Sequence, residues 1–187
     1  MHYFFMLRFT GILILLNLYS IVYSQNTDSL KTLLSSTGDK QKQAELLIEL
    51  GKAYKHKQPD SALYYFKKSL NISKTSFYKK GEGLSYLSIG TLFRTSQNYD
   101  SAMSYFNSAI AIFNESGDTA ELCKTYSFIG NMYYDRGLFE DAIKNHEKSL
   151  TLATAAHLSK NMGQSMFNLG NVYKSINVLS KALNYYL

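Results

Sequence analysis

Residues 83–110 read GLSYLSIGTLFRTSQNYDSAMSYFNSAI, and residues 123–150, forty positions later, read CKTYSFIGNMYYDRGLFEDAIKNHEKSL. Both stretches carry an Ile-Gly pair, an aromatic residue three positions after that Gly, and an Ala twelve positions after it. Agreement at several separate offsets is not expected by chance. Because a period of about 20–50 residues is typical of repeat architectures, this spacing decides the fold class.

The same pattern extends outward from these two stretches toward both ends of the chain. The Gly recurs four times, and an Ala follows it each time. We therefore expect an array of four repeat units over residues 41–187, the last of them incomplete. The two series are Gly51, Gly90, Gly130 and Gly170, and Ala62, Ala102, Ala142 and Ala182.

Each unit is predicted to consist of two antiparallel helices, so the fold class is all-α. The Gly, the residues seven and four before it and the aromatic residue three after it share one helical face. A second apolar face begins at the Ala and continues four, seven and eight residues later. Between the two faces lie Gln97, Gly137 and Asn177 at one shared position, where Gly and Asn tolerate a left-handed backbone.

The pattern Leu-Gly-x-x-Tyr, then Ala, then an aromatic residue four positions later, resembles the tetratricopeptide repeat (TPR) family over residues 41–187. This resemblance implies a right-handed α-solenoid of antiparallel helix pairs, the TPR superhelix. The period of 40 residues is longer than the usual ~34 and resembles an extended subtype with longer helices. His146 departs from the pattern, because an aromatic residue is usual at its position.

Residues 1–24 are predicted to be a secretory signal peptide. Arg8 precedes an apolar stretch, and Val22 and Ser24 have the aliphatic and small side chains typical before a cleavage site. Cleavage before Gln25 would give an exported protein of the periplasm or cell envelope. The uncharged run is slightly shorter than the ~20 residues that span a membrane, so an uncleaved signal anchor is the alternative. The leader resembles those of Bacteroidetes-type bacteria, and residues 25–40 are expected to form an N-terminal capping helix segment.

The sequence indicates no catalytic, cofactor or metal site, and we expect no enzyme. The formal net charge of +6 comes from Lys residues interleaved with Asp and Glu, which is typical of a solvated surface and not of a nucleic-acid-binding one. Cys123 falls at a small-residue packing position, so we interpret it as a core residue and not a nucleophile. His146 falls on the core face of a second helix, and we interpret it as a satisfied core histidine.

A second face of each first helix is the candidate binding surface. It comprises the positions six and three before the Gly and one and four after it. In TPR arrays this face lines the concave groove, so the resemblance implies a protein or peptide ligand there. Asn131 and Asn171 match an Asn with which TPR domains often bond a ligand backbone, and the basic residues favour an acidic ligand. The predicted partner-binding residues are Arg94, Lys124, Asn131, Tyr134, Gln164, Asn171 and Lys174.

The C-terminal end supports a second hypothesis. Residues 181–187 make only the first two turns of the last second helix, so we expect a fragment, with a short complete protein as the alternative. Exported TPR arrays of this style resemble the sensory regions of bacterial histidine kinases and helix-turn-helix regulators. The rival hypothesis is therefore the sensory region of a truncated signalling protein. Membrane contact is expected only if the signal stays uncleaved or a C-terminal part is missing.

Overall fold

The computed structural model describes residues 27–187, and within that range the chain forms helices and no strand, as the all-α prediction requires. The predicted signal peptide at residues 1–24 lies outside the described residues. A helical segment over residues 27–36 comes first. The helices that follow are α2 (Lys40–Tyr54), α3 (Pro59–Thr75), α4 (Lys79–Thr95), α5 (Tyr99–Ser116), α6 (Thr119–Asp135), α7 (Phe139–Ala155), α8 (Ser159–Ser175) and α9 (Leu179–Tyr186).

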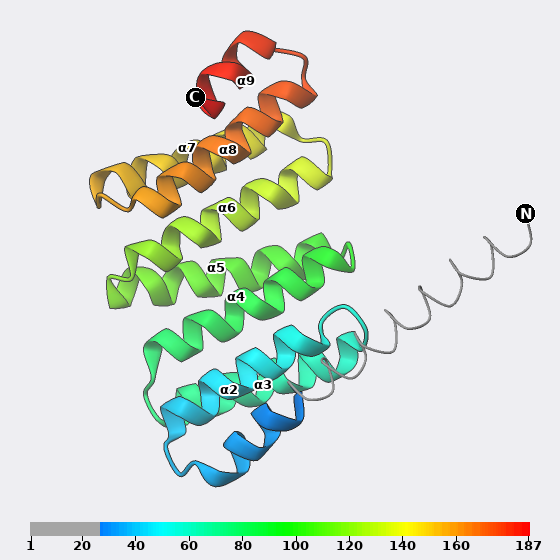
Figure 1. The fold of residues 1–187 in the computed structure, drawn as a ribbon, viewed down its shortest axis with the longest axis vertical. Helices are drawn as coiled ribbons and strands as arrows, with labels where there is room; N and C mark the ends of the chain where they lie inside the picture. Colours follow the sequence, from blue (N-terminus) through cyan, green and yellow to red (C-terminus); the bar gives the residue numbers. More distant parts are fainter. Residues whose placement is uncertain (1–26) are drawn as a thin grey trace, which may run out of the picture.

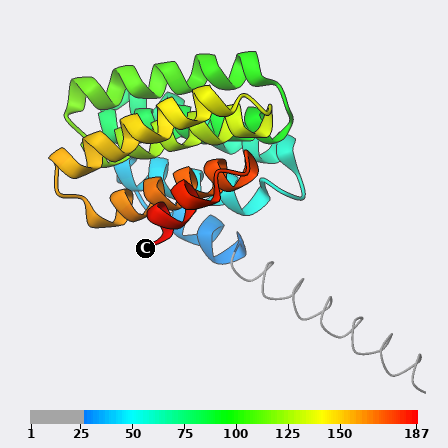
Figure 2. The ribbon, with the colours of Figure 1, turned by 90° about the horizontal axis from the view of Figure 1, so that it is seen from above.

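These helices form antiparallel pairs that stack along one axis, so the chain is an α-solenoid (Figure 1). Cα atoms of successive first helices, α2, α4, α6 and α8, come within 8 Å of one another, whereas those of the successive second helices α3, α5, α7 and α9 do not. The first helices therefore line the inner, concave side and the second helices the outer side. Seen along the stack, successive pairs are rotated relative to one another (Figure 2).

The Gly of each unit packs against an aromatic or imidazole ring from the second helix of the same pair. A Cβ atom added to Gly130 would lie 2.6 Å from His146 Cε1, which is closer than real Cβ contacts. The same close approach occurs in every pair, and it explains why the Gly and the ring position recur together. The four contacts join Gly51 to Phe66, Gly90 to Phe106, Gly130 to His146, and Gly170 to Tyr186.

Buried hydroxyl groups link the two helices of the first and third pairs. Ser69 Oγ on α3 donates a hydrogen bond to the Ala44 carbonyl oxygen on α2, at 2.8 Å. Ser149 Oγ on α7 donates to the Cys123 carbonyl oxygen on α6, also at 2.8 Å. Ala109 holds this position in the second pair and packs there without a hydroxyl. Small side chains thus allow the close packing that the sequence pattern predicts.

The turns confirm the predicted left-handed positions and add three more. Gly117 closes α5 with a φ of 70°, and Phe77 and His157 take the same conformation forty residues to either side, with φ of 55° and 53°. These last two were not predicted from the sequence, because Phe rarely adopts a positive φ and His, although it does so more often than most residues, is not a specific signal for it. The three residues predicted for turns within pairs are Gln97 at 60°, Gly137 at 71° and Asn177 at 59°.

The two ends of the described chain pack differently. Helical residues 27–36 lie beside the first pair, where Lys31 Nζ is 5.8 Å from the centre of the Tyr54 ring. The capping role of residues 25–40 stays a prediction. In α9 only Ala182 is buried, and the side chains of Leu179 and Leu183 are exposed. Among residues 27–187, every helix is too short or too polar to cross a bilayer.

Candidate functional site

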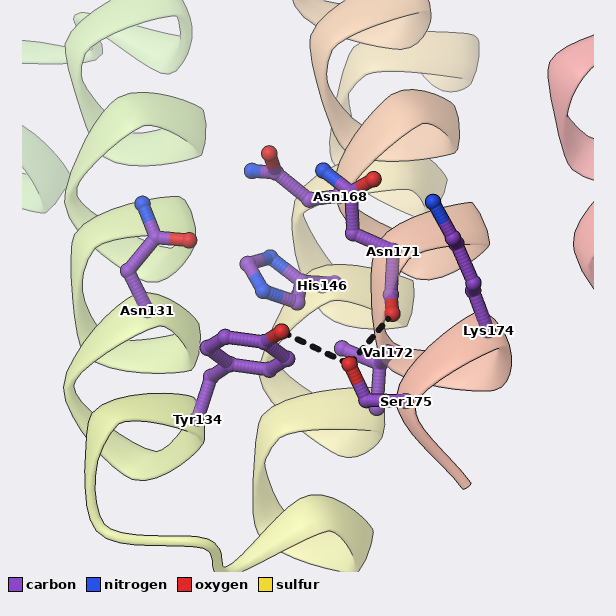
Figure 3. A pocket seen from close by; sticks show the side chains of 8 residues that line it. All are labelled: Asn131, Tyr134, His146, Asn168, Asn171, Val172, Lys174 and Ser175. Carbon is purple, nitrogen blue, oxygen red and sulfur yellow. Dashed lines mark hydrogen bonds between the residues drawn. The ribbon is translucent and has the colours of Figure 1, made fainter. Parts of the chain in front are cut away.

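A cavity of about 330 Å³ lies on the concave side between α6, α7 and α8 (Figure 3). Asn131 and Asn171 each directly follow the Gly of their unit, and Tyr134 and Lys174 lie one turn later. The 40-residue repeat therefore places equivalent positions of α6 and α8 on facing sides of the cavity. The full lining is Asn131, Tyr134, His146, Asn168, Asn171, Val172, Lys174 and Ser175.

A second cavity, of about 340 Å³, adjoins the first along α6 and α8. Asn131 and Asn168 line both cavities, so the two lie next to each other, and we call them together the groove. Six of the seven predicted binding residues line it, so the register of the repeat, applied to the groove face that the TPR resemblance implies, places them on one surface. They are Lys124, Asn131, Tyr134, Gln164, Asn171 and Lys174.

Hydrogen bonds already occupy several polar atoms of the groove. The Tyr134 hydroxyl and Ser175 Oγ lie 2.7 Å apart, and Ser175 Oγ also donates to the Asn171 carbonyl oxygen. The Tyr186 hydroxyl on α9 donates to Asn171 Oδ1 at 2.8 Å. Gln164 Nε2 donates to Asn168 Oδ1 at 3.0 Å. The acceptor oxygens of Asn168 and Asn171 are therefore used, whereas their NH₂ groups face the groove.

The positive charge of the groove is smaller than its sequence predicts. Arg94 on α4 forms an ion pair with Asp135 on α6 and lines neither cavity of the groove. Lys124 donates to Glu121 on its own helix at 2.5 Å. Lys174 makes no ion pair within residues 27–187, so among the predicted basic residues it is the one whose charge is not balanced by a neighbouring acidic side chain. Charge compensation by neighbouring acids thus corrects the expected contributions of Arg94 and Lys124.

A separate cavity of about 410 Å³ lies farther along the concave side, between α2, α4 and α6. Lys52, Lys55 and Lys124 are among its lining residues. Partial burial, the Arg94 guanidinium and the Lys52 ammonium lower the pKa of Lys55. Lys52 pairs with Glu49 and Lys124 with Glu121, so of these three Lys residues only Lys55, which the predicted set omitted, makes no ion pair within residues 27–187.

His146 is buried as predicted, but it is not satisfied. Its side chain is 1% exposed, and neither ring nitrogen has a hydrogen-bond partner within residues 27–187. Burial lowers the pKa of His146 to about 4, so the imidazole is neutral at pH 7. Asn168 Nδ2 is likewise buried without a partner in the described chain. The expectation of a satisfied core histidine is therefore wrong, and the ring is part of the groove floor.

Cys123 occupies the packing position assigned to it from the repeat pattern. The residue is fully buried, and burial raises the pKa of its thiol, so it stays protonated at neutral pH. No cluster of three or more His, Cys, Asp or Glu side chains in residues 27–187 is arranged to hold a metal ion.

The groove residues that the predicted set lacks include His146, Asn168 and Ser175. Asn168 lies two residues before its Gly and Ser175 five after, which places both just beyond the four offsets taken as the groove face. Successive helical residues are about 100° apart, so a face wider by about 40° would have included them. His146 was recognisable as a departure from the aromatic pattern, but periodicity did not reveal its missing partners.

Two family models, both of the tetratricopeptide repeat, match residues 84–115 and 121–187. The chain belongs to the tetratricopeptide repeat family. The helix pairs described above are thus TPR units, and the predicted solenoid is confirmed. No curated protein sequence matches this TPR chain.

Solved TPR-like structures share the fold at low sequence identity. BtubC (BKLC) from P. vanneervenii is 19% identical, with a TM-score of 0.70 over 87% of this chain and 70% of BtubC. A Rap protein in complex with Competence and Sporulation Factor is 17% identical, with a TM-score of 0.77. The Rap conjugation gene regulator of plasmid pLS20, in complex with the Phr* peptide, is 19% identical, with a TM-score of 0.76. Both Rap matches cover 90% of this chain but 48% of the Rap protein, so the chain spans about half of their length.

Proposed function

We propose that this TPR chain is an exported scaffold that binds an extended peptide or protein segment in its groove. The observation that carries the proposal is the pairing of equivalent polar residues across the groove, Asn131 on α6 facing Asn171 on α8. The Asn131 amide forms no hydrogen bond within residues 27–187, and Asn171 keeps its NH₂ group available. Amide groups of this kind donate to and accept from the backbone of an extended ligand.

Two further observations support a peptide ligand and its charge. The two Rap proteins of similar fold were solved in complex with Competence and Sporulation Factor and with the Phr* peptide, which motivates a test of peptide binding here. The Lys174 and Lys55 ammonium groups, neither of which forms an ion pair within residues 27–187, give the concave side a positive character. We therefore assign an acidic partner to this surface, because complementary charge increases the association rate and the specificity.

The location of the protein is part of the same proposal. Residues 1–24 carry the order of basic, apolar and small residues that directs export, and the 40-residue units resemble those of exported TPR proteins. A sensory region of a larger signalling protein is the second candidate, because exported TPR arrays of this style resemble such regions. Reading the gene beyond the Leu187 codon separates the two, since a continuing frame with a membrane span favours the receptor.

Peptide display on the purified protein tests groove binding. The affinity of a selected peptide is measured by calorimetry for the wild type and for the Asn131→Ala, Lys174→Glu double variant. We expect about tenfold or greater weakening in the double variant, equivalent to the loss of one good polar contact. Lys144→Glu on α7 makes the same charge change on the outer side, where the Lys144 side chain is 73% exposed, and serves as the matched control. Equal affinities for all three proteins would place binding elsewhere.

A further inference from the structure

The third TPR unit differs from the others at the residue that packs on its Gly. Phe66 and Phe106 hold this position in the first two units, and His146 holds it in the third. The imidazole fills the same space against Gly130 but brings two nitrogen atoms into the core. Because buried polar atoms are almost always hydrogen-bonded, the absence of any partner for either nitrogen in residues 27–187 requires an explanation.

The unpartnered atoms belong to side chains that line the groove. In Figure 3 the imidazole extends from α7 toward α6, with the Asn131 side chain on α6 to its left and the Asn168 side chain on α8 above it in this view. Asn168 Nδ2 also lacks a partner, and only 8% of this residue is exposed. Two buried polar side chains on different helices thus converge on one cavity of about 330 Å³. An acceptor that enters the cavity can take a hydrogen bond from the Asn168 NH₂ group and one from the single N–H of the neutral imidazole.

The unused atoms of the cavity select the chemistry of that group. Asn168 and Asn171 have their oxygen atoms engaged by Gln164 and Tyr186, so they offer NH₂ donors. The neutral imidazole offers one N–H, and Lys174 offers an ammonium group. No acidic side chain is among the lining residues. An excess of donors with one cation fits an acceptor of single negative charge, whereas a phosphate group of nearly double charge would exceed the one cation present.

We propose that this cavity holds one acidic side chain of the bound peptide, whose carboxylate accepts hydrogen bonds from His146 and Asn168 at the floor and faces Lys174 at the rim. The proposal rests on the proposed peptide-binding function and adds the position and chemistry of one ligand residue. It also explains why the third unit departs from the aromatic pattern. A site built to hydrogen-bond one group rejects analogues that lack it, so the pocket fixes which ligand residue lies beside α7.

The direct test uses two small probes, N-acetyl-glutamic acid N-methylamide and N-acetyl-glutamine N-methylamide, at pH 7. Nuclear magnetic resonance follows the ring nitrogens of His146 and the side-chain amide of Asn168 during titration. We expect a saturable shift of both signals with the Glu probe, at millimolar concentrations typical of one small group, and about tenfold weaker binding of the Gln probe. Equal binding of the two probes, or no saturable shift of His146 with the Glu probe, would overturn the proposal.

Two variants complete the test while keeping the fold. His146→Phe restores the residue of the first two units, and Asn168→Asp keeps the side-chain shape but places a carboxylate against the ligand. Each is expected to weaken binding of the Glu probe at least about tenfold, with an unchanged circular dichroism spectrum. Undiminished binding of the Glu probe to both variants would also overturn the proposal.

The same variants separate this proposal from the proposed function. For a peptide selected by display, each acidic residue is changed in turn to its amide. If one change weakens binding to the wild type but has no effect on binding to His146→Phe, the pocket and the groove are both supported. If peptides bind through Asn131 with no such dependence, the pocket proposal fails and the groove function stands. If no peptide binds while the Glu probe occupies the pocket, the groove function fails, and what remains is a pocket for a carboxylate that does not belong to a bound peptide.

Discussion

The imidazole of His146 on α7 packs against Gly130 on α6, so closely that a Cβ atom on Gly130 would lie 2.6 Å from the ring. This contact couples the packing of the third pair to the floor of the groove, because the same ring lines the cavity between α6, α7 and α8. A change on either side of the contact therefore has a consequence for both stability and binding.

Gly130→Ala is expected to lower the free energy of unfolding by about 1–3 kcal/mol, the usual cost of overpacking a core contact. The added methyl group would force the His146 ring to shift between two packed helices. The neighbouring Asn131→Ala variant is the control and should change stability by no more than about 0.5 kcal/mol. Urea unfolding of the two variants measures both effects. If Gly130→Ala left the free energy of unfolding unchanged while Asn131→Ala lowered it, the assignment of the helix faces would be wrong.

Stability is expected to depend on the protonation of His146. Burial lowers the pKa of His146 to about 4 in the folded protein, whereas the unfolded chain takes up a proton near pH 6.5. The free energy of unfolding should therefore decrease as the pH falls from about 6.5 to about 4, by up to roughly 3 kcal/mol in total. Above pH 6.5 the ring is neutral in both states and makes no contribution.

His146→Phe isolates this effect from the titration of the carboxylates. The variant should be more stable than the wild type already at pH 7, because it removes two buried nitrogens without partners. The difference in unfolding free energy between the two proteins should widen on acidification. Parallel pH profiles for the wild type and His146→Phe would contradict the assignment of a buried, neutral imidazole.

Hydrogen exchange is expected to be uneven along the solenoid, because each helix is protected by its neighbours. α5 buries Ala102, Phe106, Ala109 and Phe113 between two pairs, whereas α9 buries only Ala182. Amide protons of α9 should therefore exchange far faster than those of α5 when both are followed by mass spectrometry. Equal protection of the two helices would argue against independent packing of the units.

Export is expected to remove the leader between Ser24 and Gln25. N-terminal sequencing of the protein recovered from the cell envelope should begin at Gln25. A chain that keeps Met1 and sediments with the membranes would identify the alternative, an uncleaved signal anchor.

Much of the fold was predictable because each Gly and its ring form a contact within one repeat unit. Gly90 and Phe106 occur at a fixed spacing in the sequence. Their packing requires that α4 and α5, which carry them, lie side by side. Much of the groove was predictable for the same reason, since Asn131 and Asn171 recur at one position of the repeat. Contacts that repeat with the period can be inferred from the period.

The remaining features depend on interactions that do not repeat. Arg94 was assigned to the groove, but it forms an ion pair with Asp135 on the next first helix, whereas the equivalent positions forty residues later, Tyr134 and Ser175, are joined by an uncharged hydrogen bond. The burial of His146 followed from its register, but its lack of partners depends on the side chains of α6 and α8 around it. Register predicts where a side chain lies, whereas hydrogen bonding and charge compensation require the three-dimensional neighbours.

The central claim is that ligands bind on the concave side, and the most direct measurement is a map of backbone amide shifts on addition of a display-selected peptide. The account predicts that the largest shifts fall on α6 and α8, centred on Asn131 and Asn171, with smaller ones on α4. Shifts confined to the outer helices α5 and α7, with Asn131 and Asn171 unmoved, would contradict it.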